Sequence, residues 1–402
     1  CPLSIMKSAW QNDLFKFAIH RTVAVAHGAA RKRKEIVEGG AEFVIINFDG
    51  VGIVKKEIIA GGFDLIVVDE ASAYKNAQTE RWKDLRDLTK AIKGLWMLTG
   101  TPAAQSPVDA YGLAKLVNPK GVSPFFGQFR DTVMMKLSMY RWIPKPTAQL
   151  IVHKALQPAI RFEKSQCLDL PPITFVERDA PLTPQQHKYY QVLKKQMLIE
   201  AAGEEITSVN AAINLNKLIQ IAAGSVYSTN KEVIDFDCSN RLEALEEIIE
   251  EASKKVIVFA TFRHSIAMIE GFLNRKGGFL NRKGYTVGVV HGGISVNKRV
   301  ELFDQFQTTP NPHVLVIQPK SAAHGVTLTA ANVVIWYAPV TSVETYLQAN
   351  ARIDRPGQKN AMTIVHIKGS EVESRLYKML SSNIDNHNKI IDLYRQELNQ
   401  IA

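Results

Sequence analysis

The feature that most constrains the fold is the alternation of short, almost continuously apolar segments with amphipathic stretches. The first part of the chain holds four such segments: RTVAVAH (21–27), EFVIINF (42–48), FDLIVVD (63–69) and GLWMLTG (94–100). Amphipathic stretches at 30–40 and 79–93 lie between them and favour helices. Strands that are buried on both faces read as near-continuous apolar runs, which is typical of parallel sheets covered by helices. The sequence therefore predicts an α/β fold.

The same pattern returns in the second half. Five further apolar segments are separated by helical or loop stretches: KKVIVFAT (254–261), YTVGVVHG (285–292), HVLVIQP (313–319), NVVIWYAP (332–339) and MTIVHIKG (362–369). Between the halves, 103–235 holds most of the prolines and long helical patterns, so we predict that it is mainly helical. With 402 residues and about 150 per domain, two or three domains are expected. We predict two parallel-sheet α/β parts at 1–120 and 236–370, a helical insertion at 121–235, and a helical tail at 371–402.

The composition limits the possible partners and the cellular compartment, but it does not indicate a function. A net charge of +10 permits a polyanionic partner but does not demand one. Three cysteines, far apart, match neither a metal site nor a disulfide framework, which favours a reducing, intracellular compartment. No apolar run approaches the ~18 residues that span a bilayer, so no membrane segment is expected. The chain begins at Cys1 without an initiator Met or a signal-peptide pattern, and we interpret it as a fragment or as a chain whose beginning lies outside these residues.

One local feature is a tandem repeat, GFLNRKG at 271–277 and again at 278–284. Seven residues make about two helical turns, so one helix could absorb the second copy roughly in phase. We interpret the repeat as a recent duplication or an artefact of the sequence. The alternative is a basic spur on the surface.

Two carboxylates stand at the end of a predicted strand. Asp69 and Glu70 directly follow FDLIVV, and Thr99 follows the next strand, GLWM. In doubly wound sheets ligands bind at the carboxyl ends of the strands. A carboxylate pair there suits Mg²⁺ with nucleotide phosphates: Asp69 would hold the metal, mostly through water, and Glu70 would orient the attacking water. An ordinary strand-ending turn is the alternative.

A basic cluster follows the fourth strand of the second half. The stretch SVETYLQANARIDRPGQ (342–358) is predicted to be a helix that ends at Pro356 and Gly357. Three polar residues spaced i, i+4 and i+7 would then share one face: Gln348, Arg352 and Arg355. Two guanidinium groups with Gln358 just beyond would form a fork for phosphate oxygens. The alternative is a solvated basic face that pairs with Asp354.

Together these motifs resemble a known family. DEAS (69–72), LTGTP (98–102) and QANARIDRPGQ (348–358), in this order, resemble motifs II, III and VI of helicase superfamily two. They are closest in form to the Swi/Snf-like DNA translocases, whose last motif reads QAxxRxxRxGQ, and within these to phage or prophage members. Further segments resemble motif Ia, the linker between lobes, motif IV with its successor, and motif V: 1–17, 161–193, 256–269, 289–295 and 318–339.

The resemblance covers nearly the whole chain, and it implies a function. It implies two RecA-like parallel-sheet lobes with a helical insertion, ATP and Mg²⁺ between the lobes, and DNA-stimulated ATP hydrolysis that drives movement on duplex DNA without sequence preference. Asp69 and Glu70 of the first lobe and Arg352 and Arg355 of the second would be catalytic. Three residues would contact the nucleotide: Thr99, Gly325 and Gln358. The expected location is the cytoplasm of a bacterium or a phage-infected host.

Contacts to DNA are carried over by motif position. The candidates are Lys7, Thr101, Arg263, His291, Lys320 and Thr329. Enzymes that follow the DNA backbone use main-chain N–H groups, hydroxyls and scattered basic side chains without reading bases. Each candidate could instead be ordinary surface or a helix cap. The basic run at 31–34 is predicted to be a solvated helix face rather than a specific site.

The chain departs from the family pattern in one important respect. No GxxxxGK[ST] loop, whose backbone N–H groups cradle phosphates, occurs in the 402 residues. The family has this loop shortly before motif Ia, so we expect it upstream of Cys1, and we expect the fragment to bind DNA weakly without turning over ATP. A second departure is Ser72, where His is common, and a third is Thr327, where Asn is common. The rival functions are a strand-separating helicase and a nucleic-acid-binding scaffold that has lost ATPase activity.

Overall fold

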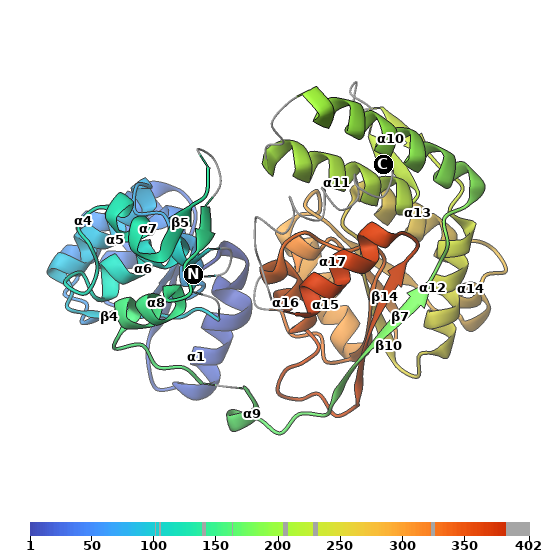
Figure 1. Cartoon of the computed structure of the whole chain (residues 1–402). Coiled ribbons are helices and arrows are strands. Elements are labelled where there is room, and N and C mark those ends of the chain that lie inside the picture. Colours follow the sequence, from blue (N-terminus) through green and yellow to red (C-terminus); the bar gives the residue numbers. More distant parts are fainter. Residues whose placement is uncertain are drawn as a thin grey trace. The chain divides into compact units, whose positions relative to one another are not determined.

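The computed structural model of the chain (Figure 1) forms two compact units, residues 1–162 and 163–402, and each is described by itself. The structure describes residues 1–100, 102–103, 106–138, 142–162, 164–203, 208–227, 232–322 and 326–382. The boundary between the units falls inside the predicted insertion, 121–235. The predicted boundaries near 120 and 235 lie within the two units, and the four-part division stays a prediction.

The first unit is built on parallel strand pairs covered by helices. Its strands are β1 (Val23–Ala26), β2 (Phe43–Ile46), β3 (Leu65–Val68) and β4 (Gly94–Met97). β1 pairs in parallel with β2, and β3 pairs in parallel with β4. The helices of this part are α1 (Asn12–Phe17), α2 (Ala30–Glu38), α3 (Phe48–Val51), α4 (Lys55–Ala60) and α5 (Glu80–Ala91). All four strands lie inside the apolar segments predicted from the sequence, and α2 and α5 lie inside the predicted helical stretches.

The rest of the first unit is mostly helical but includes a hairpin. Its elements are α6 (Ala110–Val117), α7 (Phe126–Val133), β5 (Met134–Lys136), β6 (Trp142–Pro144) and α8 (Ala148–Leu156). β5 and β6 pair antiparallel. Tyr111 and Phe129 form a small core here with residues of α7 and α8. The prediction of a mainly helical stretch missed this hairpin, because strands of three residues leave no periodic pattern to read.

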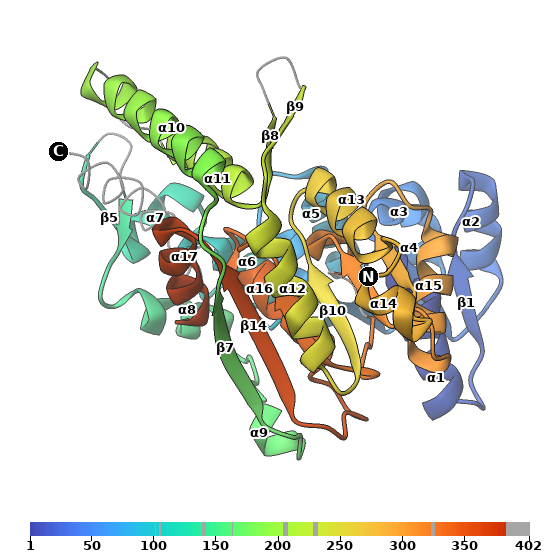
Figure 2. The same cartoon turned by 90° about the vertical axis from the view of Figure 1, so that its right-hand side faces the viewer.

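The second unit contains a six-stranded, entirely parallel sheet (Figure 2) in the order β11-β12-β10-β13-β14-β7. Its strands are β7 (Ile173–Asp179), β10 (Lys255–Phe259), β11 (Val287–Val290), β12 (Val314–Ile317), β13 (Ala331–Trp336) and β14 (Met362–Lys368). Both faces are covered, which explains why the central strands are apolar throughout. The predicted α/β class with parallel sheets is confirmed.

Helices pack on both faces of this sheet. They are α12 (Ser239–Glu251), α13 (Arg263–Leu273), α14 (Phe279–Lys283), α15 (Val296–Thr308), α16 (Val343–Asn350) and α17 (Glu371–Ser381). Val256 and Val258 of β10 belong to a core with α12 and α13. Ile257 and Phe259 point to the opposite face and belong to a core with α15 and α16. The alternation within one strand therefore supplies both cores.

The elements between residue 163 and α12, apart from β7, are mostly helical and belong to the second unit. They are α9 (Lys164–Cys167), α10 (Pro184–Gly203), α11 (Ser208–Ala222), and the antiparallel pair β8 (Ser225–Tyr227) and β9 (Val233–Asp235). Leu215 and Leu218 of α11 are fully buried in the same core as β10. The buried amide of Gln186 donates to the carbonyl oxygens of Ile221 (2.7 Å) and Ala222 (3.1 Å), which fastens α10 to the end of α11.

The structure corrects the prediction for β7. The sequence placed Ile173–Asp179 in a linker, but it pairs along its full length with β14 as the edge of the sheet. Most of its residues are exposed, so a continuous apolar run was never required of it. Membership of the sheet is set here by the partner strand, and the apolar pattern on which the prediction relied is absent.

The tandem repeat does not form one helix. α13 ends at Leu273 and α14 begins at Phe279, with a turn between them in which Gly277 has a φ of 76°. The two copies nevertheless make equivalent contacts. Leu273 and Leu280, which occupy the same place in each copy, are both buried. Arg275 and Arg282, again equivalent, form ion pairs with Glu246 and Glu250 of α12. Each copy therefore packs on α12, and these arginines do not form a free basic spur.

A buried histidine links α16 and α17 to β14. The Nε2 atom of His366 lies 2.8 Å from the Tyr346 hydroxyl, and its ring stacks on Tyr377 at 4.1 Å between centroids. Burial lowers the pKa of His366 from 6.5 to about 4, an effect that the nearby Glu177 carboxylate partly opposes. The fold therefore favours the neutral imidazole.

Acidification is expected to destabilise the second unit through His366. Because the folded-state pKa is below the unfolded one, the stabilisation is complete above pH 6.5 and is lost as the pH falls toward 4. We expect a loss of about 2 kcal/mol in the free energy of unfolding between pH 7.5 and pH 5 from this group. Urea unfolding at both pH values measures it. His366→Gln should lack this part of the loss, and the exposed-site control His187→Gln should keep it; equal losses in both variants would contradict the assignment.

Candidate active site and nucleic-acid interface

In the first unit, Asp69 follows β3 and is held by two donors. The indole Nε1 of Trp10 donates a hydrogen bond of 2.9 Å to Asp69 Oδ2, and the backbone N–H of Glu70 donates one of 3.0 Å to Asp69 Oδ1. Trp10 lies on a π-helix, Met6–Gln11, a form that often occurs at functional sites. Each carboxylate oxygen keeps a further lone pair. The carboxylate is therefore oriented but still able to accept.

The backbone turns sharply at the second carboxylate. Glu70 adopts a left-handed conformation, with φ 51° and ψ 54°, and it is the only non-glycine residue with positive φ in the described part of the chain. Such a conformation costs free energy and is found preferentially at functional sites. It lets the chain leave β3 directly into the 3₁₀ turn Ala71–Tyr74.

The ends of β3 and β4 are joined, which brings the predicted residues to one edge. The N–H of Leu98 donates to Val68 O (2.8 Å), and the N–H of Ala71 donates to Leu98 O (2.9 Å). Thr99 follows at once, half-buried. Lys7 is exposed on the π-helix that carries Trp10. Thr101 lies outside the described residues.

In the second unit, three predicted DNA contacts follow neighbouring strands. Arg263 begins α13 after β10, His291 follows β11, and Lys320 follows β12, so all lie at the carboxyl edge. The side chain of Gln318 joins these ends: it accepts from Gly292 N (3.3 Å) and donates to Thr261 O (3.4 Å).

Arg263 and His291 are direct neighbours across Gly293. A Cβ atom on Gly293 would lie 2.9 Å from Arg263 Nη2 and 3.0 Å from His291 Cε1. Arg263 and Lys320 are exposed. The edge therefore presents basic groups to solvent.

Thr329 does not join this group. It precedes β13, at the amino end of that strand, and its hydroxyl accepts a hydrogen bond of 3.3 Å from Gln307 Nε2.

The arginine pair is arranged differently from the prediction. α16 ends at Asn350, so Arg352 and Arg355 lie in the turns that follow and do not share one helical face. Arg352 is only 2% exposed; its Nη1 donates to Val326 O (3.5 Å), and its carbonyl accepts from Leu328 N (2.9 Å). Arg355 is half-buried, and its Nη1 lies 3.5 Å from Thr327 Oγ1. Both guanidinium groups therefore approach one segment, 326–328.

Gln358 fastens the turn that follows the helix. Its buried amide donates to Ala331 O (2.9 Å) and Ile353 O (3.2 Å), and its oxygen accepts from the N–H groups of Lys359 (3.0 Å) and Asn360 (3.1 Å). These backbone groups use the hydrogen-bonding capacity of the amide, which supports a role in fastening the turn. Contact of Gln358 with a nucleotide stays a prediction, and Gly325 lies outside the described residues.

The basic run at 31–34 is partly internal. Arg33 is buried, and its guanidinium donates to Asn47 Oδ1 (2.7 Å) and to the carbonyl oxygens of Gly28 (2.8 Å) and Ala26 (3.3 Å). Its neighbours Arg31 and Lys34 pair on the surface with Glu35 and Glu57. The solvated-face prediction is therefore wrong for Arg33, which ties α2 to the ends of β1 and β2.

The acidic residues of the described chain suit a magnesium ion that is held by one carboxylate together with phosphate oxygens and water. Within the described residues, no group of three or more His, Cys, Asp or Glu side chains could hold a metal ion. Mg²⁺ in nucleotide enzymes commonly relies on one or two carboxylates, phosphate oxygens and water. Asp69, with its free lone pairs, fits that pattern.

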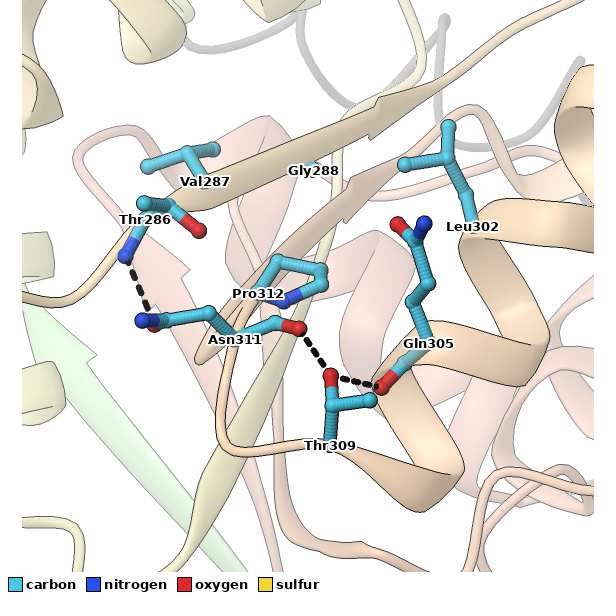
Figure 3. A pocket seen from close by; sticks show the side chains of 8 residues that line it. All are labelled: Thr286, Val287, Gly288, Leu302, Gln305, Thr309, Asn311 and Pro312. Carbon is cyan, nitrogen blue, oxygen red and sulfur yellow. Dashed lines mark hydrogen bonds between the residues drawn. The ribbon is translucent and has the colours of Figure 1, made fainter.

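A pocket of about 400 Å³ lies away from these residues (Figure 3), where β11 and β12 begin. The polar groups of Asn311 and Thr309 are engaged with the protein itself: Thr286 N donates to Asn311 Oδ1 (3.0 Å), and the Thr309 hydroxyl donates to Gln305 O (2.8 Å). The lining therefore offers few polar groups to a ligand. Among the described residues no helix is long and apolar enough to cross a membrane.

Two protein-family models match the sequence of this chain. The SNF2-related domain model matches residues 1–223, more than half of the chain, and the helicase conserved C-terminal domain model matches residues 240–357. The mouse chromodomain-helicase-DNA-binding protein 1-like is 22% identical over 413 residues, which cover 98% of this chain and 44% of that protein. Putative protein p41 of Acyrthosiphon pisum secondary endosymbiont phage 1 is 22% identical, covering 90% of this chain and 78% of its own.

A solved structure is also similar. The SWI2/SNF2 ATPase core of Sulfolobus solfataricus in complex with double-stranded DNA has 22% sequence identity and a TM-score of 0.41, covering 95% of this chain and 79% of that chain. The present chain spans less than half the length of the mouse protein and of several other curated helicases. The family models, which together match most of the sequence, are decisive. The chain belongs to the SNF2-related family and carries its helicase C-terminal domain.

Proposed function

We propose that this chain is the motor of an ATP-dependent DNA translocase, which couples ATP hydrolysis to movement along duplex DNA. Membership of the SNF2-related family supports ATP hydrolysis by a helicase-type enzyme. Each unit would contribute to the reaction, with carboxylates from the first and arginines from the second. Because the 402 residues contain no GxxxxGK[ST] segment, turnover would depend on a phosphate-binding loop outside them.

The observation that carries the proposal is the arrangement of Asp69 and Glu70. Trp10 and the Glu70 N–H hold the Asp69 carboxylate in one orientation, and the left-handed backbone of Glu70 ends the β3 direction immediately after it. Bound Mg²⁺ would neutralise charge on the phosphates. Asp69 would hold the metal through its remaining lone pairs, and Glu70 would orient the attacking water.

The second unit would add positive charge where negative charge develops. Arg355 is half-buried, its Nε donates to Ala351 O (3.2 Å), and its Nη1 lies 3.5 Å from the Thr327 hydroxyl. A planar guanidinium suits phosphate oxygens. Arg352 is buried and supports the segment 326–328: its Nη1 donates to Val326 O, and its backbone carbonyl accepts from Leu328 N. We therefore propose a direct role for Arg355 and a supporting role for Arg352.

DNA would be gripped by its backbone along the carboxyl edge of the second sheet. Arg263, His291 and Lys320 converge there, and base-reading side chains are not needed for this grip. Lys7, on the π-helix of the first unit, is a further candidate contact. A contact of Thr329 with DNA stays a prediction, because this residue lies at the amino end of β13.

Binding to duplex DNA is expected to weaken steeply with salt and to be indifferent to sequence. Each phosphate contact releases counterions, so log K falls linearly with log salt concentration. Arg263→Ala combined with Lys320→Ala should reduce that slope by about 1 per lost contact. Lys276→Ala with Lys283→Ala, the same charge change within the repeat, is the control. Fluorescence anisotropy with scrambled duplexes at several salt concentrations measures it; a strong preference for one duplex, or equal slopes in both variants, would contradict the proposal.

Translocation is tested by displacement of a triplex-forming strand from duplex DNA. The longest form of the protein that its gene encodes should displace the strand with ATP and should fail when Glu70→Gln is introduced. Separation of the duplex itself is not expected. Displacement without ATP hydrolysis, or duplex separation at the same rate, would favour a scaffold or a strand-separating helicase.

A further inference from the structure

The outer edge of β7 is a free sheet edge. In the part of the chain that the structure describes, β7 pairs with β14 alone, on one side, over seven residues. Figure 2 shows it beside β14 at the margin of the sheet. An edge of this length presents unpaired N–H and C=O groups, which form a template for another strand.

The register identifies which backbone groups point outward. Met362 N donates to Pro172 O (2.9 Å), and Ala180 N donates to Lys368 O (2.7 Å). Because successive residues of a strand direct their backbone groups to alternate sides, even-numbered residues of β7 face β14. The N–H and C=O groups of Phe175 and Glu177 therefore point away from the sheet.

Natural proteins blunt such edges, and in β7 the charged residues Glu177, Arg178 and Asp179 stand only in the last part of the strand. Lysine, proline and bulges on an edge strand discourage further pairing, yet the sequence ITFVERD has neither lysine nor proline and its pairing with β14 is continuous. Two large apolar side chains remain in solvent instead: Phe175 is 54% exposed and Val176 is 41% exposed.

The two faces beside this edge differ in charge. On the face of Val176 and Arg178, helix α12 carries Glu243, Glu247 and Glu251, which lie one helical turn apart on a single stripe. All three are exposed. Arg178 is the basic partner of this stripe, close to Glu247 and 4.0 Å from Glu251. One guanidinium against three carboxylates leaves an acidic surface, on a chain whose net charge is +10.

The opposite face carries one aromatic side chain and two carboxylates that share a lysine. Phe175 lies there with its ring 6.2 Å from that of the buried His366. The neighbouring carboxylates of Glu177 and Asp179 are both paired with Lys368. A strand added at this edge would thus meet the α12 carboxylates with every second side chain. Beside Phe175, its other side chains would meet an aromatic ring.

We propose that the outer edge of β7 binds an extended peptide in which basic residues alternate with apolar residues. Main-chain hydrogen bonds to Phe175 and Glu177 would provide affinity, and the alternation would provide specificity. The basic side chains would lie along the glutamate stripe of α12, and the apolar ones would cover Phe175. This peptide site is separate from the basic carboxyl edge proposed for DNA, so either proposal can fail without the other.

The test uses a fluorescent nine-residue peptide of alternating lysine and valine, titrated against residues 1–402. We expect saturable binding. Methylation of the backbone nitrogens of alternate residues should weaken it at least tenfold, because methylated nitrogens cannot pair with a strand edge, and glutamate in place of lysine should abolish it. Equal binding of the methylated peptide, or no binding of the parent, would overturn the proposal.

Protein variants locate the site. Glu247→Lys with Glu251→Lys should lower affinity at least tenfold, whereas Glu301→Lys with Asp304→Lys on α15, an equal change in charge, should leave it within twofold. Phe175→Pro removes an outward N–H without touching the β14 pairing, so it should weaken binding more than Phe175→Ala does. This pair keeps the test valid if the charge reversal impairs folding. Equal effects of the α12 and α15 variants, or of proline and alanine, would exclude strand addition at β7.

Discussion

Arg355→Ala is expected to lower DNA-stimulated ATP hydrolysis by roughly 10³–10⁵, the range by which an arginine that stabilises transition-state charge accelerates phosphoryl transfer. Nucleotide and DNA affinity should fall only modestly, because the charge that the guanidinium stabilises develops during the reaction. Arg355→Lys should not restore activity, since a point charge does not reproduce the planar fork. The measurement is kcat, with nucleotide affinity from a separate titration, in the longest form of the protein that its gene encodes.

Two comparisons make this result specific. Arg282→Ala, which removes an exposed arginine of α14, should leave kcat unchanged. A solvated Arg355 predicts a loss within about 1 kcal/mol, less than tenfold, and a near-normal kcat would therefore refute a catalytic role. Arg352→Ala does not separate catalysis from folding. Because this side chain is buried and its Nη1 donates to Val326 O, its loss should lower stability as well as kcat.

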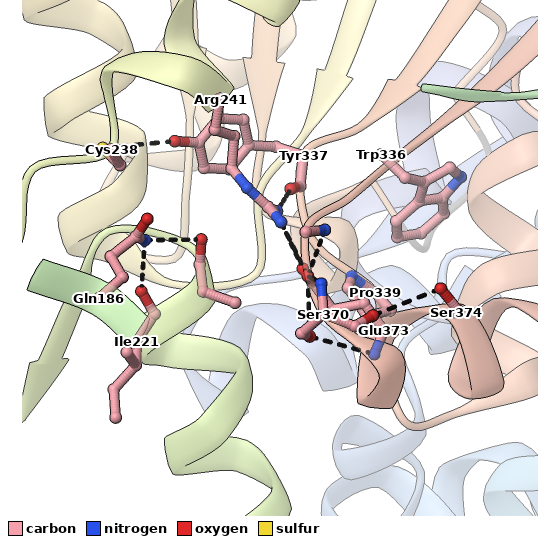
Figure 4. A network of polar contacts seen from close by, with 12 residues as sticks. Gln186, Ile221, Cys238, Arg241, Trp336, Tyr337, Pro339, Ser370, Glu373 and Ser374 are labelled. Atoms are coloured by element: carbon pink, nitrogen blue, oxygen red, sulfur yellow. Dashed lines mark hydrogen bonds and ion pairs between the residues drawn. The ribbon is translucent and has the colours of Figure 1, made fainter. Parts of the chain in front are cut away.

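Removal of one partner of the Arg241–Glu373 pair is expected to destabilise the second unit by about 3–5 kcal/mol, because it leaves a buried charge uncompensated. Figure 4 shows the network: Arg241 Nη2 donates to both Glu373 carboxylate oxygens at 2.8 Å, and Arg241 Nη1 donates to Tyr337 O. Glu373 Oε2 also accepts from Gly369 N (2.9 Å) and Ser370 N (3.0 Å). The pair thus joins α12, the end of β13 and the start of α17.

The comparison between single and double variants separates charge from packing. Arg241→Met and Glu373→Leu should each unfold at much lower urea concentrations than the parent, whereas the double variant should be more stable than either, because no isolated charge remains. Glu371→Gln, which breaks the more exposed Arg375–Glu371 pair, should cost less than about 1 kcal/mol. Single-variant losses that small at the buried pair would show that the network contributes little to stability.

The sequence predicted strands most accurately where both faces of the strand are buried. β10, β12 and β13 are central strands, so burial required an apolar side chain at nearly every position, and the pattern was legible without knowledge of their partners. β7 shows the converse: it is exposed on its outer side and carries Thr174, Glu177 and Arg178, so only its pairing with β14 makes it a strand.

At the candidate site, the sequence identified residue types and their order more reliably than their geometry. Asp69 and Glu70 stand at the end of β3 as predicted, but the contact of Trp10 with Asp69 joins residues 59 positions apart and leaves no local pattern. The arginine spacing suggested one helical face, yet Gln358 captures backbone carbonyls from two segments and the chain leaves the helix at Asn350.

The sequence by itself determined the α/β class, the central strands and the family, because these depend on local periodicity and on motifs that are contiguous in the chain. Only the tertiary structure decided that β7 joins the sheet, that Arg33 and Arg352 are buried, and that Arg263 and His291 are neighbours across Gly293. Those outcomes depend on which distant segments supply hydrogen-bond partners and exclude water. Neither spacing nor composition encodes that information, because burial of a side chain is a property of its surroundings in space.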